Sequence, residues 1–164
     1  LLDLGEIQKI DLIVQFLDVF GGVLAMSSRL AVESASEREL KDLASKLEAI
    51  IGSIGELEEH RNAWKTFTDS LLPIHKNLVL RLVGNGIRTQ IMSDALQLDQ
   101  DRDMEQDIEM LQTHLRKAAR ALHGRDALGT SNALLEYVEV VKLSMSARSK
   151  TNSSEIKVGH QSNA

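Results

Sequence analysis

The sequence IQKIDLIVQFLDVFGGVLAMSSRLAV, residues 7–32, is the densest apolar run of the chain. On a helix Asp11, Gln15 and Asp18 share one narrow polar stripe, because residues three and four positions apart lie on the same helix face. Every other face of such a helix is apolar, so most of it must be buried. The run therefore predicts the core helix of a helical bundle.

The aspartates and the glycine pair of this run lead to two further predictions. Asp11 and Asp18 interrupt it, and a bilayer needs about 20 mostly apolar residues, so we expect no full transmembrane segment. Gly21 and Gly22 lie at its middle, where each glycine costs about 1 kcal/mol relative to alanine. We expect the close approach of a neighbouring backbone at this pair, or a kink between two shorter helices, and a hinge is the functional alternative.

The composition agrees with an all-α fold. The chain has 164 residues, 43% of them hydrophobic and 26% charged, which is typical of one globular domain. It contains one Trp, one Tyr and three Phe, and Pro73 is its single proline. A core so poor in aromatic rings suits interlocking helices better than sheets. We predict an antiparallel bundle of four to five helices.

Start signals predict where the helices begin. Helix one is expected over residues 5–31. Ser34 and Ser36 each precede a glutamate by three residues, Glu37 and Glu39 respectively, so either serine can form a capping box for a second helix.

The end of the second helix is less well marked. Its apolar residues alternate spacings of three and four, and we favour one helix that continues to about residue 72. Gly52 and Gly55 leave open a break. Pro73 then suits the first turn of a third helix.

Two more helices are expected further along the chain. Residues 104–122 form an amphipathic stretch, which His123 and Gly124 end. Thr130 or Ser131 is expected to cap a fifth helix. From Arg148 onward the residues are mostly polar, so we predict a bundle domain, 1–147, and a disordered tail, 148–164.

The apolar pattern also predicts which side chains meet. On the second helix the spacing is that of a seam packing against one or two other helices, as in a coiled coil. The predicted core or interaction seam consists of Phe16, Leu17, Phe20, Leu43, Leu47, Ile50, Ile54, Leu57 and Trp64.

Several classes of function are disfavoured. A net charge of −5 argues against nucleic-acid binding, and the absence of cysteine excludes disulfides and thiolate sites. The acidic run from Asp99 resembles an EF-hand loop at its start, but Met104 and Met110 replace its glycine and bidentate glutamate. The five histidines lack metal-site spacing, and no phosphate loop or nucleophile motif occurs. We therefore expect no enzyme activity, catalytic residue, metal or cofactor.

The leading hypothesis is a non-enzymatic helical-bundle module for protein interaction or scaffolding, with a protein partner or self-association. The chain begins with Leu1, so we expect it to be part of a larger protein, and we favour a cytoplasmic location. The alternative is a membrane-active bundle with a sequestered apolar first helix. That plan resembles the helical pore-forming toxins and cell-death bundles, but a membrane is the less favoured partner.

Overall fold

The computed structural model describes residues 4–87 and 105–161. Within these ranges the chain is an all-α bundle, as the composition predicts. Its helices are α1 (Leu4–Ser34), α2 (Glu37–Gly52), α3 (Leu57–Leu71), α4 (Leu78–Ile87), α6 (Glu105–His123) and α7 (Ala127–Gln161).

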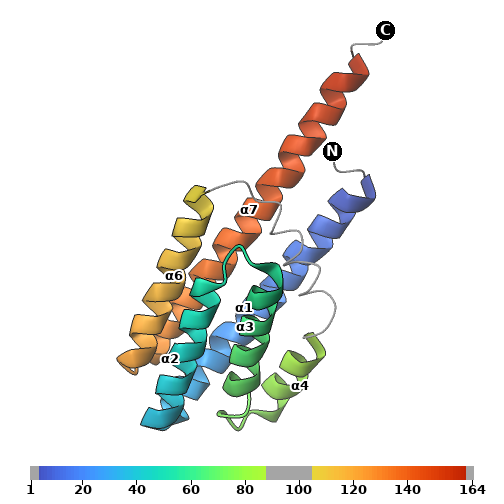
Figure 1. The fold of residues 1–164 in the computed structure, drawn as a ribbon. Helices are drawn as coiled ribbons and strands as arrows, with labels where there is room; N and C mark the ends of the chain where they lie inside the picture. The colour runs from blue at the N-terminus through green and yellow to red at the C-terminus, as the bar shows by residue number, and fades with distance from the viewer. Residues whose placement is uncertain (1–3, 88–104, 162–164) are drawn as a thin grey trace.

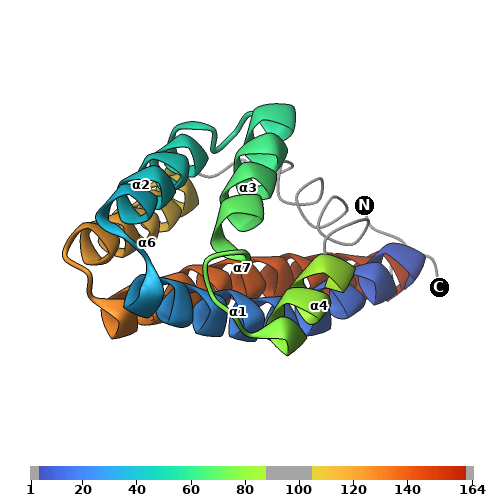
Figure 2. The same cartoon turned by 90° about the horizontal axis from the view of Figure 1, so that it is seen from below.

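The helices alternate in direction along the chain (Figure 1). α1 and α7 are antiparallel and make the most extensive helix pair, while α6 packs on α7 and α2 packs on both α6 and α3. Seen from below, α1 and α7 run side by side, and α2 and α6 form a second pair (Figure 2). α3 packs on α2, and α4 packs on α1. The buried apolar core therefore lies between α1, α2, α3, α6 and α7.

Aromatic rings meet where α1, α3 and α7 converge. Trp64 of α3 is 2% exposed and lies with its ring centroid 6.3 Å from Phe20 of α1 and 5.6 Å from Tyr137 of α7. Phe67 packs edge-on against the same indole at 6.0 Å. The single tryptophan therefore links three helices, and aromatic pairs of this kind add about 0.5–1.5 kcal/mol beyond area burial.

The glycine pair of α1 has two different environments. A Cβ built on Gly21 would lie 3.0 Å from Cγ1 of Val138, so this glycine permits the close approach of α7. A Cβ on Gly22 would meet nothing within 4 Å. Close packing therefore explains Gly21, as expected, but the bundle gives no packing reason for Gly22.

The favoured single second helix is wrong. α2 ends at Gly52, and a turn through Gly55, whose φ is +100°, separates it from α3. That φ lies in the left-handed region that glycine adopts at no steric cost. The break turns α3 back against α2 and brings Trp64 into the core.

The third helix also begins later than expected. Pro73 lies in a turn, and α4 begins at Leu78, where the side chain of Asn77 accepts a hydrogen bond from the amide of Leu80 (3.0 Å). Asn77 is a standard N-cap residue, because its side-chain oxygen satisfies a free amide of the first turn.

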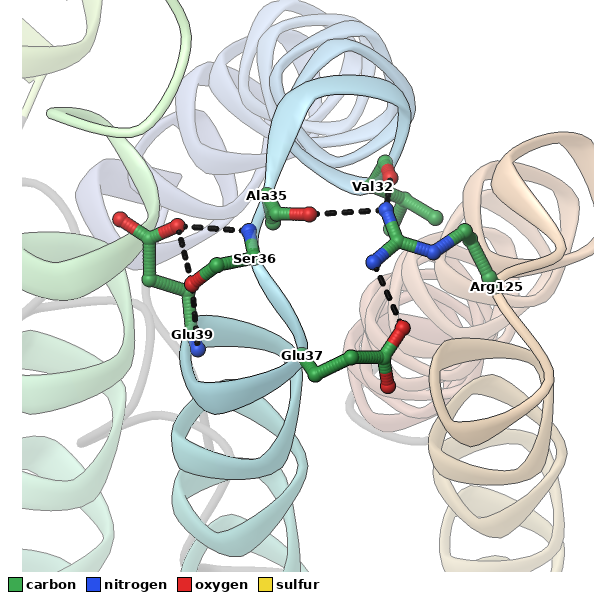
Figure 3. Close-up of polar contacts among 6 residues, drawn as sticks. All are labelled: Val32, Ala35, Ser36, Glu37, Glu39 and Arg125. Carbon is green, nitrogen blue, oxygen red and sulfur yellow. Dashed lines mark hydrogen bonds and ion pairs between the residues drawn. The ribbon is translucent and has the colours of Figure 1, made fainter.

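The capping box at the start of α2 is present, and Ser36 forms it (Figure 3). The amide of Ser36 donates to the Glu39 carboxylate (2.7 Å), and the amide of Glu39 donates to Ser36 Oγ (3.2 Å). Ser34 instead donates to the carbonyl of Leu30 within the last turn of α1. The hydrogen bonds of Ser36 lower the pKa of Glu39 below its usual range.

The side chain of Arg125 connects two turns that are far apart in sequence, and we call its hydrogen bonds to the α1–α2 turn the clamp (Figure 3). Its guanidinium donates to the carbonyl oxygens of Ala35 (2.7 Å) and Val32 (3.4 Å) and to the carboxylate of Glu37 (2.8 Å). Arg125 has a φ of +53°, a conformation that costs a non-glycine residue about 1–2 kcal/mol. The clamp ties the α6–α7 turn to the α1–α2 turn and offsets this cost.

α6 ends at His123 as predicted, but the expected cap of the last helix is wrong. Asp126 caps α7, since the amide of Gly129 donates to its carboxylate (2.8 Å). Thr130 and Ser131 lie inside α7, and both are buried. Asp126 precedes the helix directly, so it meets the free amides first.

α7 is 35 residues long, and its final part projects beyond the other helices (Figure 1). The helical backbone thus continues into the segment predicted as a tail, 148–164. A helix that projects away from a core gains little tertiary stabilisation, which is consistent with a polar tail outside the bundle. The division into a domain, 1–147, and a tail stays a prediction. The acidic residues 99–104 of the EF-hand comparison lie outside the described residues.

Candidate interaction surface

α1 carries two apolar faces, and the structure buries one of them. Ile13, Leu17 and Leu24 are at most 7% exposed and point into the bundle. A second set of apolar residues lies on the outside of the same helix, and we call it the outer stripe: Leu12, Phe16, Val19, Val23, Met26 and Leu30.

Exposed and half-buried side chains alternate along the outer stripe. Leu12, Val19 and Met26 are 57%, 53% and 54% exposed, and the other three are half-buried. Spacings of four and three residues alternate from one end to the other, which is the spacing of a helix that packs along another helix. The expectation that most of α1 is buried is therefore wrong for this face.

α4 carries a second exposed apolar set beside α1. Leu78, Val79, Leu82 and Val83 are between 40% and 69% exposed and share one face of α4, because they are one, four and five positions apart. We call these residues the α4 patch. Exposed apolar groups that are contiguous on a helix face mark interaction sites more often than single exposed side chains do.

A small apolar cavity lies beneath α4. It has a volume of about 30 Å³ and is lined by side chains of α1, α3 and α4, including Phe20, Thr68 and Ile87. This volume accommodates little more than a water molecule. Ser27 lines it, and its buried hydroxyl has no hydrogen-bond partner among the described residues. The cavity is too small for an organic ligand.

The predicted seam lies largely inside the bundle. Leu17, Phe20, Leu43, Leu47, Ile50 and Trp64 are buried at 9% exposure or less. Phe16 and Ile54 pack against the core as partly buried residues, and Leu57 is half-buried. Of this seam, Phe16 alone belongs also to the outer stripe. The other residues of the stripe were missed, because an almost uniformly apolar helix does not reveal which face turns outward.

The polar chain through His60 is structural. Trp64 Nε1 donates to His60 Nε2 (3.1 Å), so the neutral imidazole carries its proton on Nδ1. Nδ1 lies 3.0 Å from Ser53 Oγ, and that hydroxyl donates to the carbonyl of Ile50 (3.0 Å). Burial lowers the pKa of His60 to about 4. His60 Nδ1 holds a proton and accepts none, so this arrangement does not activate Ser53 as a nucleophile.

In the described part of the chain, the other polar side chains form no cluster of three or more potential metal ligands. His114 and Lys117 contact Glu136 at 3.2 Å and 3.0 Å, and the bond from Lys117 is the main cause that lowers the pKa of this carboxylate. His75 is 2% exposed, and burial lowers its pKa. No group of three or more metal-ligating side chains occurs among residues 4–87 and 105–161 for which side chains are described.

The exclusion of a membrane-spanning segment was too strict. Gln8–Ser34 is 27 residues long and apolar enough to cross a bilayer by length and composition alone. In the bundle, 44% of its most apolar window is buried. The core helix of a water-soluble bundle passes the same test, so length and composition do not decide between the two.

Comparison with protein-family models, with curated proteins and with solved structures finds no match to this chain.

Proposed function

We propose that this chain is a non-enzymatic protein-interaction module that binds a polypeptide through the outer stripe of α1. The observation that carries the proposal is the exposed heptad-like row of apolar side chains on a helix whose opposite face builds the core. α4, which packs on α1, carries the second exposed apolar set, the α4 patch.

The exposed apolar side chains of the outer stripe gain free energy when a partner covers them. Complete burial of a Leu, Val or Met side chain contributes about 1.5–3 kcal/mol, so covering Leu12, Val19 and Met26 from their present exposure adds roughly 1 kcal/mol each. A partner helix that covers the half-buried members as well gains further contacts. Such a surface supports specific binding without any catalytic group.

Site-specific photo-cross-linking in the native cells tests the proposal. A benzophenone amino acid replaces Val19 on the outer stripe, and a control carries it at Glu48, an exposed position on α2. We expect an adduct with a polypeptide, either another protein or a second copy, from position 19 and none from position 48. If position 19 forms no polypeptide adduct, or if both positions label proteins equally, the proposal is wrong.

A second candidate is a membrane-active bundle, favoured by the length and apolar composition of Gln8–Ser34. In this function α1 leaves the bundle and inserts into a bilayer. Dye release from neutral and anionic liposomes, before and after mild acidification, tests it. Release that is lost in a Val19→Asp variant supports the membrane function, whereas intact liposomes under all four conditions refute it.

A further inference from the structure

We propose that the occupant of the outer stripe is the same stripe of a second copy of this chain, with the two α1 helices antiparallel about a two-fold axis near Gly21. This inference rests on the proposed interaction function and names its partner. It accounts together for the spacing of the stripe, for the charges on its flank and for the unexplained glycine.

The spacing of the stripe is the same when read from either end. An axis at residue 21 places Leu12 opposite Leu30, Phe16 opposite Met26 and Val19 opposite Val23 of the second copy. A two-fold dimer needs such a self-complementary patch, because each residue must meet its symmetry counterpart. Every row whose spacings alternate four and three reads the same in both directions, so the spacing permits this pairing, and the flanking charges and Gly22 favour it.

The charges beside the stripe are complementary in the same arrangement. Asp11 and Arg29 are both exposed and lie on the same flank of α1, since they are separated by a whole number of helical turns. Arg29 also pairs with Glu33 of its own helix (3.3 Å), and in the dimer its guanidinium is shared between Glu33 and the incoming Asp11. In an antiparallel pair equal flanks face each other, so Asp11 of one copy lies near Arg29 of the other, twice. The midpoint between Asp11 and Arg29 is residue 20, whereas the two-fold axis of the stripe lies at residue 21. The two positions differ by one residue, about 1.5 Å along the helix.

Gly22 lies next to the axis and on that same flank. A Cβ at this position would meet no heavy atom within 4 Å in the single chain, so the bundle itself gives no reason for a glycine there. In the dimer the two Gly22 residues face each other across the axis. The missing side chains allow the two helix backbones to approach closely, as Gly21 does for α7.

α4 lies on the other flank of the stripe. Gly84 and Ile87 of α4 line the small cavity together with Phe20 and Val23 of α1, which places α4 beside the middle of α1. The two-fold axis therefore brings the α4 helices of both copies to the same side of the dimer.

Disulfide trapping tests the pairing, because the chain has no native cysteine. Three samples of the full chain are oxidised: Leu12→Cys alone, Leu30→Cys alone, and an equal mixture of the two. In the antiparallel dimer two copies of residue 12 lie about 27 Å apart along the helix axis. A disulfide needs Cα atoms about 5–6 Å apart. We therefore expect covalent dimers in the mixture and none in either single variant.

Sedimentation velocity provides the second readout and a matched control. Leu12 and Leu128 are both 57% exposed, but Leu128 lies on α7 and outside the stripe. We expect Leu12→Glu to weaken dimerisation at least tenfold and Leu128→Glu to leave it unchanged. Arg29→Asp should weaken the dimer as well, and the double variant Asp11→Arg, Arg29→Asp should restore it.

Each outcome decides between the pairing and the broader function. Covalent dimers of Leu12→Cys alone overturn the antiparallel arrangement, and a chain that is monomeric at all concentrations overturns self-association. If the monomeric chain still forms a polypeptide adduct from position 19 in cells, the interaction function stands and the second copy is not its partner. If position 19 labels only lipid, both proposals fail and the membrane candidate is favoured.

Discussion

The buried hydrogen-bonded chain Ser53–His60–Trp64 makes a specific prediction about acid stability. His60 is 7% exposed, and its pKa falls from the ordinary value of 6.5 to about 4 because burial disfavours the charged ring. Protonation of Nε2 would also remove the acceptor for Trp64 Nε1. The folded state therefore resists a proton that the unfolded chain accepts readily.

The sign and size follow from proton linkage. Above pH 6.5 neither state binds the proton, so the stability contributed by a neutral His60 is fully present. As the pH falls from 6.5 toward 4 the unfolded state becomes protonated first, and stability is lost. The shift corresponds to about 3 kcal/mol in all, and most of it is lost by pH 4.5. Typical domains have only about 5–15 kcal/mol in total.

Urea unfolding at pH 7 and pH 4.5 measures this loss. The variant His60→Gln keeps an oxygen that can accept a hydrogen bond from Trp64, but it does not titrate. Its stability should therefore fall less than that of the parent chain between the two pH values, by about 2–3 kcal/mol. His123→Gln, at an exposed position, is the control and should behave like the parent. If His60→Gln loses as much stability on acidification as the parent, the buried neutral histidine is not the cause.

Two further predictions concern the backbone and the clamp. In the monomeric Leu12→Glu background, Gly22→Ala should raise the free energy of unfolding by about 0.5–1 kcal/mol, because the helix gains propensity and the Cβ enters open space. Gly21→Ala should lower the free energy of unfolding, because its Cβ would lie 3.0 Å from a valine of α7. Equal effects of the two variants in thermal melts would refute both explanations. Arg125→Ala should cost about 1–2 kcal/mol, because carbonyls at the α1–α2 turn lose their donor. Glu37→Gln should change the free energy of unfolding little, since its ion pair with Arg125 is exposed. If Arg125→Ala and Glu37→Gln had equal effects in the same urea titration, the clamp would not be the cause.

The sequence predicts the elements that are strongly amphipathic. The apolar positions of α2 and α6 occupy one face each, so residues such as Leu43 and Leu115 could be assigned to the core from periodicity alone, and both are 0% exposed. α1 differs because it is apolar on several faces. Its polar stripe shows where water lies and favours burial of Leu17 on the far side, but the pattern does not show that the exposed face extends beyond this stripe to Val19. Tertiary packing makes that choice.

Other features depend on contacts that periodicity does not contain. The turn at Gly55 competes with a continuous apolar pattern, and it prevails because it brings Trp64 into the core. Arg125 adopts a left-handed conformation next to Gly124, where sequence rules expect the glycine, because its guanidinium reaches carbonyls some ninety residues away in sequence. The role of His60 likewise requires the turn that brings Ser53 beside it.

We propose that α1 has two faces with different roles, one in the core and the other at an interface. The most direct measurement compares Leu17→Asp with Val19→Asp, two positions that are 7% and 53% exposed, by thermal unfolding and by sedimentation. Leu17→Asp buries an unpaired carboxylate and should cost about 3–5 kcal/mol or unfold the chain. Val19→Asp should keep the melting transition of the monomer within a few degrees and abolish association. A Leu17→Asp protein that melts like the parent, or a Val19→Asp protein that still associates, would contradict the account.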